Sequence, residues 1–375
     1  MKTLQAFCFL INGLFFSAFC NAQNTDSVNK VTMVADAQYA HHGFLYKIIW
    51  GKNYRTTWNT PVAVDKFYFK TTAHQYTPVK TGGGLQTISL LITDENNAEW
   101  SLRSVKKNPA RWISPFWQKT FIRKIVQDQV SASFPYGALV VPELAAALQI
   151  DHATPKLVVI NDDTLLGKFR EQFANRLCFL EERNPKGKSI STEKLLKLKD
   201  SLPGTLIDTV TYLKCRLLDI VIGDWDRHAD QYRWYIDNSK TIKIYKPIPN
   251  DRDQVFFNST GVLPEIILKL GFMRYLEGFN YEVRNIKRFT QRGASLDKKI
   301  LGRMSSRQFE TITKEVINYL SDDVLKHSLL NLPAELQTGE FDIPGKLISR
   351  RNALPTLSKK YFRKVIRRAN RKNIN

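Results

Sequence analysis

The chain has 375 residues, 43% of them hydrophobic and 24% charged, and 56 Lys and Arg against 35 Asp and Glu give a formal net charge of +21 at pH 7. This length fits one large domain or two moderate ones, with enough apolar residues for a hydrophobic core. Wholesale disorder, a collagen-like chain and a disulfide-stapled miniprotein are therefore excluded.

Residues 1–22 predict a secretory signal peptide. A short basic start is followed by the almost wholly apolar segment Leu4–Phe19, and Ala22 offers a small residue for cleavage. The apolar segment is shorter than the roughly 20 residues that a membrane anchor needs. A lipoprotein anchored at Cys20 is the weaker alternative, because bulky Phe19 precedes the cysteine. We therefore expect an exported protein that is periplasmic, envelope-associated or secreted.

The next residues predict an arm and a β-rich lobe. Residues 23–60 are aromatic and polar, which indicates an ordered arm packed on the domain. Residues 61–184 form the expected β-rich lobe, where a turn at 94–98 makes a hairpin and one helix spans Trp117–Ser133. The expected strands are Val62–Phe69, Gln86–Thr93, Trp100–Val105, Leu157–Ile160 and Leu177–Leu180.

The second half changes character near Glu182–Lys188, where Asn-Pro-Lys-Gly interrupts the pattern. Residues 185–340 predict a helical lobe that includes two short strands, Tyr232–Ile236 and Ile242–Tyr245. The expected helices are Thr192–Leu202, Ile207–Ile222, Leu263–Leu270, Ser305–Leu320 and Asp322–Leu330. A small β-rich lobe followed by a larger helical lobe makes the expected fold α+β and bilobed.

Two acidic segments carry most of the residues suited to chemistry. Gly223–Gln231 follows the apolar helix, and Pro247–Phe256 follows the second short strand; together they hold five carboxylates, one His and two Arg. Carboxylates that repel one another call for a cation, and hard oxygen ligands favour Mg²⁺ or Mn²⁺ over zinc. A structural ion-pair network is the alternative interpretation.

Other metal chemistry is poorly supported. Beyond the leader the chain has two cysteines, Cys178 and Cys215, each in an apolar stretch. Buried free thiols are the simpler interpretation and a single disulfide is the alternative. No pair of cysteines has zinc-ligand spacing, and the Asn-His and His-x-His patterns typical of metallophosphoesterases are absent.

The first acidic segment, with Asp226-Arg-His-x-x-Gln231 ahead of two strands and an Asp-containing turn, resembles the atypical protein-kinase-like superfamily. Phosphoinositide-type lipid kinases carry Asp-Arg-His-x-x-Asn, and HipA-type kinases carry Gly-Asn-Thr-Asp-x-His-x-x-Asn. CotH-type kinases end a comparable stretch in Pro-Trp-Asp-x-Asp, similar to Pro249–Asp253 here. The run also resembles exported proteins of bacterial envelopes. The resemblance implies a bilobed kinase-like fold that transfers phosphate from ATP, with Mg²⁺ or Mn²⁺, to a protein or envelope hydroxyl.

The resemblance also implies roles for the acidic segments. Asp226 would orient or deprotonate the acceptor hydroxyl, and His228 would brace the loop. Gln231 would take the place of the metal-binding Asn, and Asp253 or Asp251 would hold the metal against the β- and γ-phosphates.

In the β-rich lobe, Gly82–Gly84 would let backbone N–H groups approach phosphates, although three glycines alone are more typical of a turn. Arg103 would stand where kinases place a strand Lys, with Asp128 as its ion-pair partner. Glu182 would lie near the hinge that holds adenine. Arg for Lys, Asp for Glu and Gln231 for Asn depart from the family pattern. A degenerate pseudokinase that binds or scaffolds an envelope partner is therefore the alternative.

The end of the chain, 341–375, holds an unusual share of the charge. From Lys346 onward it has eleven Lys and Arg and no Asp or Glu. Its apolar residues form a stripe near helical spacing, which predicts a basic amphipathic helix: Leu354, Leu357, Tyr361, Val365 and Ile366. The helix either docks on the domain or attaches to an anionic membrane surface or lipopolysaccharide. Nucleic acid is not an expected partner, since no nucleic-acid-binding motif occurs.

Overall fold

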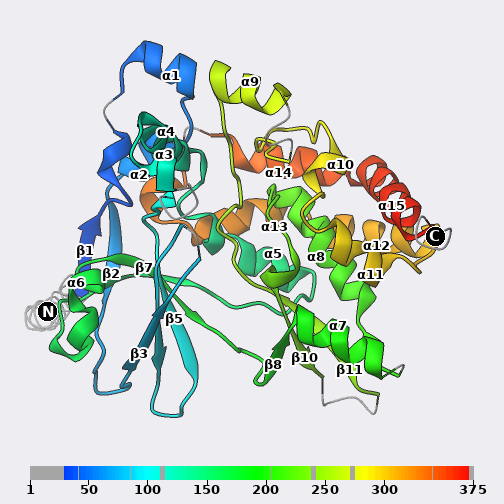
Figure 1. Cartoon of the computed structure of the whole chain (residues 1–375), viewed down its shortest axis with the longest axis horizontal. Coiled ribbons are helices and arrows are strands. Elements are labelled where there is room, and N and C mark those ends of the chain that lie inside the picture. The colour runs from blue at the N-terminus through cyan, green and yellow to red at the C-terminus, as the bar shows by residue number, and fades with distance from the viewer. Residues whose placement is uncertain are drawn as a thin grey trace, which may run out of the picture.

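The computed structural model describes residues 29–40, 42–84, 86–109, 115–202, 204–237, 242–270, 275–339 and 341–370, so the expected signal peptide lies outside the described residues. The α+β prediction is confirmed: a seven-stranded sheet belongs to the first half of the chain, and most helices belong to the second (Figure 1).

The main sheet has the order β1-β2-β6-β7-β5-β4-β3. Neighbouring strands pair antiparallel except β2 and β6, which are parallel. The strands are β1 (Lys30–Met33), β2 (Val62–Phe67), β3 (Thr77–Gly82), β4 (Ser89–Thr93), β5 (Glu99–Ser104), β6 (Lys156–Ile160) and β7 (Leu177–Glu182). All five expected strands are present, whereas β1 and β3 were not predicted. Proline and glycine in β3 hide the usual alternation of buried and exposed residues.

The expected arm is part of the domain rather than an addition to it. Its first strand β1 pairs with β2, and two short helices, α1 (Phe44–Trp50) and α2 (Arg55–Asn59), follow. Tyr54 donates to the carbonyl of Phe256 at 2.7 Å, and Trp58 donates to the carbonyl of Ser133 at 2.8 Å, both in the core.

Helix α8 (Thr209–Ile222) is the centre of the helical half and is buried along most of its length. The Asp208 side chain caps its first turn, and Gly223, with a φ of 71°, ends it. A Cβ at Gly223 would lie 2.7 Å from the Phe279 ring, so a side chain does not fit there. The helix therefore ends at a fixed point and delivers the first acidic segment.

The other helices surround α8 or the sheet, and most of them are shorter than α8. The expected helix 117–133 is divided, because the Thr120 side chain caps a new helix by accepting from Ile122 N–H at 3.2 Å. The named helices are α3 (Pro115–Gln118), α4 (Phe121–Gln129), α5 (Val141–Ala147), α6 (Arg170–Phe173), α7 (Thr192–Ser201), α9 (Val262–Leu270), α10 (Ile286–Phe289), α11 (Ala294–Leu301), α12 (Ser306–Tyr319), α13 (Asp322–His327), α14 (Ile343–Asn352) and α15 (Leu354–Asn370).

A second, four-stranded sheet aligns the two acidic segments. Its order is β8 (Ser189–Ser191), β10 (Tyr232–Ile236), β11 (Ile244–Pro249) and β9 (Leu206–Ile207). Tyr232 pairs with Pro249 at the end of the β10–β11 ladder, and Asn250 N–H donates to the carbonyl of Gln231 at 2.9 Å. The end of the first acidic segment therefore lies beside the middle of the second.

The basic end of the chain docks on the domain. The apolar stripe of α15 is buried at Leu354, Leu357, Tyr361 and Val365, and α15 packs against α10, α11 and α12. In α14, the buried Arg350 donates to the carbonyl of Ile220 at 2.7 Å. Packing thus accounts for the amphipathic pattern, while membrane attachment through the remaining basic face stays a prediction.

Both cysteines in the described part, Cys178 and Cys215, are free and buried, and burial raises the pKa of each thiol to about 12. Among the residues that the structure describes, no single helix has the length and apolar content to cross a membrane. One bent pair of segments, Ile122–Leu139 and Val141–Ala147, reaches that level by length and composition only.

Candidate functional site

A buried arginine joins the two acidic segments. Arg227 donates through Nη1 to the carbonyls of Asn250 at 2.6 Å and Asp251 at 3.1 Å, and through Nη2 to the carbonyl of Gln231 at 3.0 Å. Three backbone acceptors around one guanidinium fix both loops relative to each other. The sequence pattern included Arg227 but gave no sign of this structural role.

Arg103 connects the sheet to the second acidic segment. Its guanidinium pairs with the Asp251 carboxylate and lies 3.6 Å from Glu181 Oε2. Glu181 faces the same way because it stands diagonally across the β5–β7 ladder from Arg103. Asp251 and Glu181 raise the pKa of Arg103 despite burial, so its charge is secure. The predicted cation therefore faces the acidic cleft.

Gln231 and Asp251 are neighbours, as a shared metal would require. Gln231 Nε2 lies 3.4 Å from Asp251 Oδ2 and 3.4 Å from His228 Nε2. Rotation of the amide would present its oxygen beside the carboxylate. Burial raises the pKa of Asp251, but the cations Arg103, Lys107 and Arg227 outweigh it, so the net shift is downward and Asp251 is ionised.

The oxygen donors of Asp251 and Gln231 would supply only part of the coordination shell of Mg²⁺. Asp251 has a φ of 55°, a left-handed conformation that is uncommon outside glycine and that orients its side chain. Among the described residues, no group of three or more His, Cys, Asp or Glu could hold a metal ion. One carboxylate and one amide match the small protein share that Mg²⁺ takes when phosphates and water complete its shell.

Asp253 faces a different neighbour from Asp251. The buried Lys107 ammonium lies 3.1 Å from Asp253 Oδ2 and 3.0 Å from its carbonyl oxygen. Burial raises the pKa of Asp253, and the charge of Asp251 adds to that effect. Of the two predicted metal ligands, Asp251 is therefore the one placed beside Gln231. Sequence reasoning missed Lys107, whose only signal was its position just after the strand that carries Arg103.

Asp226 is held by a residue that the sequence did not single out. Arg292 Nε donates to Asp226 Oδ1 at 2.8 Å, and the same guanidinium lies 5.6 Å from the centre of the Tyr275 ring. Both side chains of the ion pair are partly exposed. The carboxylate is thus accessible, and an incoming acceptor can compete for it.

Asp128 does not pair with Arg103, so that prediction is wrong. Both of its oxygens accept from the Arg55 guanidinium, at 2.5 and 2.7 Å, and His42 lies 3.5 Å away. Arg55 belongs to α2 in the arm, whose packing against α4 the sequence pattern did not reveal. The partner of Arg103 on the sheet is Glu181 instead.

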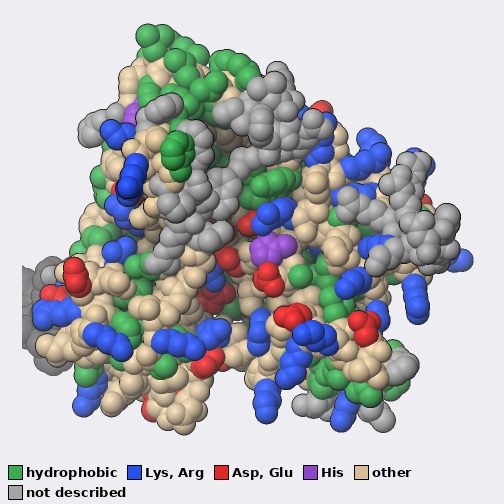
Figure 2. Space-filling model, in the orientation of Figure 1, with side chains coloured by type: hydrophobic (Ala, Val, Ile, Leu, Met, Phe, Trp, Pro, Cys, Tyr) green, Lys and Arg blue, Asp and Glu red, His purple; other side chains and the backbone are tan. Residues whose placement is uncertain are grey.

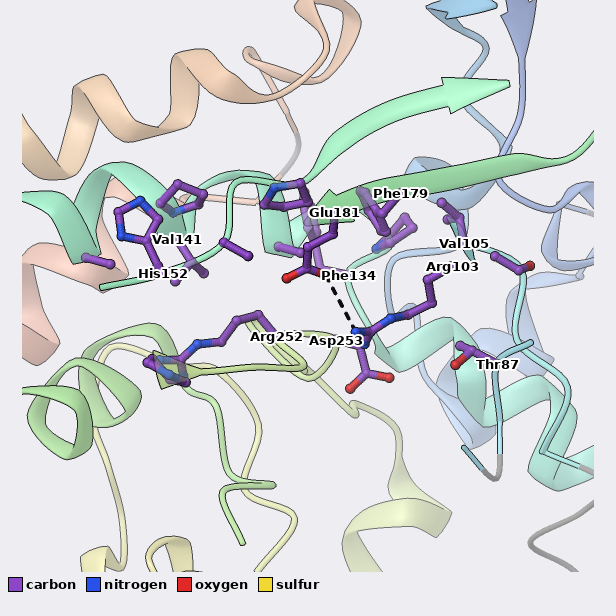
Figure 3. Close-up of a pocket in the computed structure, with 18 of the residues that line it drawn as sticks. Thr87, Arg103, Val105, Phe134, Val141, His152, Phe179, Glu181, Arg252 and Asp253 are labelled. Carbon is purple, nitrogen blue, oxygen red and sulfur yellow. Dashed lines mark ion pairs between the residues drawn. The ribbon is translucent and has the colours of Figure 1, made fainter. Parts of the chain in front are cut away.

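Two cavities meet at Arg103. The polar one, about 1210 Å³ including its open mouth, is lined by Gly82–Gly84, Arg103, Glu181, Glu182 and Asp251. The second, about 740 Å³ including its open mouth, shares Arg103 and Glu181 but is mainly apolar (Figure 3). Its apolar lining includes Val105, Phe134, Val141, Ala145 and Phe179. The glycines, Arg103 and Asp251 are therefore brought together as expected, and acidic side chains gather at this hollow (Figure 2). Glu182, which was expected near adenine, lines the polar cavity and not the apolar one.

The glycine turn contains one position where a side chain is excluded. Gly83 has a φ of 122°, and a Cβ there would lie 2.3 Å from the Thr87 carbonyl oxygen. We expect Gly83→Ala to distort the turn and weaken binding of a phosphate-bearing ligand in the polar cavity, because backbone N–H groups there would be displaced. Gly84→Ala is the matched control, since no atom lies within 4 Å of its Cβ. Isothermal titration with ATP measures both; equal affinities would show that the turn does not hold the ligand.

A network of buried ion pairs lies behind the site. For part of the two acidic segments, the structure therefore matches the alternative interpretation, a structural ion-pair network. Asp219 and Asp224 face three buried guanidiniums, those of Arg216, Arg227 and Arg252. Burial raises the pKa of Asp224 to about 6, and its Oδ1 has no partner among the described residues. Asp224, Arg227 and Arg252 are therefore structural, whereas Asp226 and Asp251 lie outside the network.

Comparison with protein-family models finds no match, and comparison with curated proteins finds none. Among solved structures, the chain is similar to the Helicobacter pylori proinflammatory kinase CtkA, with 10% identity over 81% of this chain and 99% of that chain and a TM-score of 0.40. The particular kinase families named above stay predictions. A likeness this distant assigns no activity, so the chemistry is inferred from the residues of the cleft.

Proposed function

We propose that this chain is a kinase-like phosphotransferase that uses ATP with Mg²⁺ or Mn²⁺ to phosphorylate a hydroxyl of a protein or envelope component. One observation carries the proposal: the glycine turn, Arg103 and Asp251 line a single polar cavity, and Gln231 lies 3.4 Å from Asp251. Phosphoryl transfer needs positioning and charge neutralisation more than covalent chemistry, and these residue types supply both.

Each wall of the cavity has a distinct task. The backbone of Gly82–Gly84 offers N–H groups to phosphate oxygens, and Arg103 offers a planar donor that can bind two oxygens at once. Asp251 and Gln231 would hold the metal, whose charge would neutralise the phosphates. The cavity next to Arg103 has a mainly apolar lining against which a nucleobase would pack.

Asp226 would receive the acceptor hydroxyl. Its carboxylate lies at the surface of the same loop, one residue before Arg227, and its present partner Arg292 is exposed enough to be displaced. Once a hydroxyl replaces Arg292, the carboxylate accepts its proton as the oxygen attacks the γ-phosphorus of ATP, and ADP leaves with the β–γ bridging oxygen. His228 contacts Gln231, which supports the proposed bracing of the loop.

A second candidate function is a pseudokinase that binds without turnover. The observation that favours it is that both key charges are already paired, Arg103 with Asp251 and Asp226 with Arg292. In that case the cleft would serve as a scaffold for an envelope partner. With the expected leader, both candidates would act on or near the bacterial envelope.

The deciding experiment measures ATP binding and consumption by the purified chain with Mg²⁺ or Mn²⁺. We expect Asp251→Asn to weaken metal-dependent ATP binding by about tenfold or more, because a charge-assisted ligand is lost. Binding without consumption in the unmodified chain would support the pseudokinase, and no binding at all would exclude the phosphotransferase. Asp230→Asn, at an exposed acidic position of the neighbouring loop, is the control and should bind as the unmodified chain does.

A further inference from the structure

Helices α1 and α9 expose an apolar surface that has no role in the reaction proposed above. Phe44 is 77% and Leu45 is 72% exposed, and Ile48 and Ile49 lie one turn further along the same face of α1. In α9, Val262 and Ile266 are also exposed. These six residues are called the apolar tip. Figure 2 shows hydrophobic side chains gathered where Figure 1 places α1 and α9.

The apolar tip is built into the fold rather than loosely attached. Helices α1 and α9 contact each other. Gly51, at the end of α1, also lies close to Gly261, just before α9. A Cβ on Gly261 would lie 2.4 Å from Gly51 N, and a Cβ on Gly51 would lie 2.0 Å from the carbonyl oxygen of Thr260. The fold thus holds two short helices side by side with their apolar faces in solvent, which is typical of an interaction surface.

A basic cleft adjoins the apolar tip. Tyr46 of α1 and His42, which precedes α1, line it on one side, and the exposed Lys119, Arg123 and Lys124 line it from α4 and the turn before it. An exposed Lys47 also projects from α1. The surface therefore combines apolar side chains with a cluster of cations.

Acidic groups near this surface are already neutralised. Asp128 is paired with Arg55, Asp36 lies 3.2 Å from Lys106, and Glu265 of α9 lies 3.7 Å from Arg284. The charge presented to a partner is consequently positive. An apolar face beside Lys and Arg side chains that have no acidic partner among the described residues is the composition that matches the interface of an anionic bilayer.

We propose that the apolar tip and the basic cleft form a docking site for an anionic phospholipid surface. The apolar tip inserts among the acyl chains near the headgroups, while Lys119, Arg123 and Lys124 bind the headgroup phosphates. The basic face of α15 is not required, because its apolar stripe is packed in the core. This proposal is independent of the reaction proposed for the cleft.

The test is co-sedimentation with vesicles of phosphatidylglycerol and phosphatidylethanolamine, compared with vesicles of phosphatidylcholine alone. A chain that begins at Gln23 keeps every described residue and lacks the apolar segment Leu4–Phe19, which would itself bind lipid. We expect Leu45→Ser to lower binding to the anionic vesicles about tenfold, since one large apolar side chain no longer inserts. Lys119→Glu with Lys124→Glu should lower it by a similar factor.

Two control variants separate the apolar tip from other surfaces. Leu330→Ser removes a comparably exposed leucine elsewhere, and Lys360→Glu with Arg363→Glu reverses two exposed charges on α15. Both should bind vesicles as the unmodified chain does. Loss of binding only in the α15 variant would overturn the proposal in favour of the chain's basic end. A Leu45-dependent dimer in light scattering, without vesicle binding, would instead identify the apolar tip as a contact between two copies.

Discussion

Asp226→Asn is expected to lower phosphate transfer about 10²- to 10⁴-fold, the usual contribution of a positioned proton acceptor. The amide keeps the size of the carboxylate but cannot take the proton of the attacking hydroxyl. ATP binding should change little, because the residues that line the polar cavity do not include Asp226. Transfer to a hydroxyl acceptor and nucleotide affinity are measured separately on the same preparation.

The neighbouring Asp230→Asn provides the control for this loop. Its carboxylate is exposed and lies 3.5 Å from His228, so the change alters charge near the loop without touching the proposed acceptor site. Transfer should stay within a few-fold of the unmodified rate. If Asp226→Asn transfers phosphate as fast as Asp230→Asn, Asp226 is not the proton acceptor, and Arg292 pairs with it for structural reasons only.

Asp219→Ala is expected to destabilise the fold by about 3–5 kcal/mol, the cost of removing one charged partner from a buried ion-pair network. Asp219 accepts from Arg216 at 2.7 Å, pairs with Arg252 and lies 3.7 Å from Arg227 Nε. All four side chains are buried, so water cannot replace the lost carboxylate. Urea unfolding followed by circular dichroism gives the change in the free energy of unfolding.

An exposed ion pair supplies the comparison for Asp219. Arg170 Nε lies 2.6 Å from Asp162 Oδ1 at the surface, a geometry as close as that of the buried pairs. Asp162→Ala should leave the free energy of unfolding nearly unchanged, because solvent screens the pair. Similar losses in the two variants would show that burial does not decide the strength of the network.

The sequence predicts the elements that carry strong local signals. Buried Val62 and Val64 alternate with exposed residues in β2, and α8 has a long apolar run. Both elements lie within a few residues of their predicted bounds. The Asp226-to-Gln231 spacing likewise indicated a loop that meets the Asp251 turn. Local patterns of this kind survive folding because neighbours in sequence determine them.

The sequence did not predict contacts between residues that are far apart along the chain. Asp128 was assigned to Arg103, but the arm brings Arg55 to both of its oxygens from 73 positions away. Arg292, 66 positions beyond Asp226, carries no local signal at all. The stripe of α15 fits a membrane helix and a docked helix equally well, since both bury one apolar face. Only the packed structure distinguishes these cases.

The contact between Arg350 and Ile220 determines how much of the chain must be synthesised before α8 can pack in its final position. It links the last turn of α8 to a residue 130 positions later in the chain, and α15 then covers the neighbouring core. When the loop Gly223–Gln231 has left the ribosome, the nascent chain still lacks most of the helices that pack against α8. The cleft can therefore take its final form only after the chain has been made at least as far as α14, so products that end before Arg350 should not fold around α8.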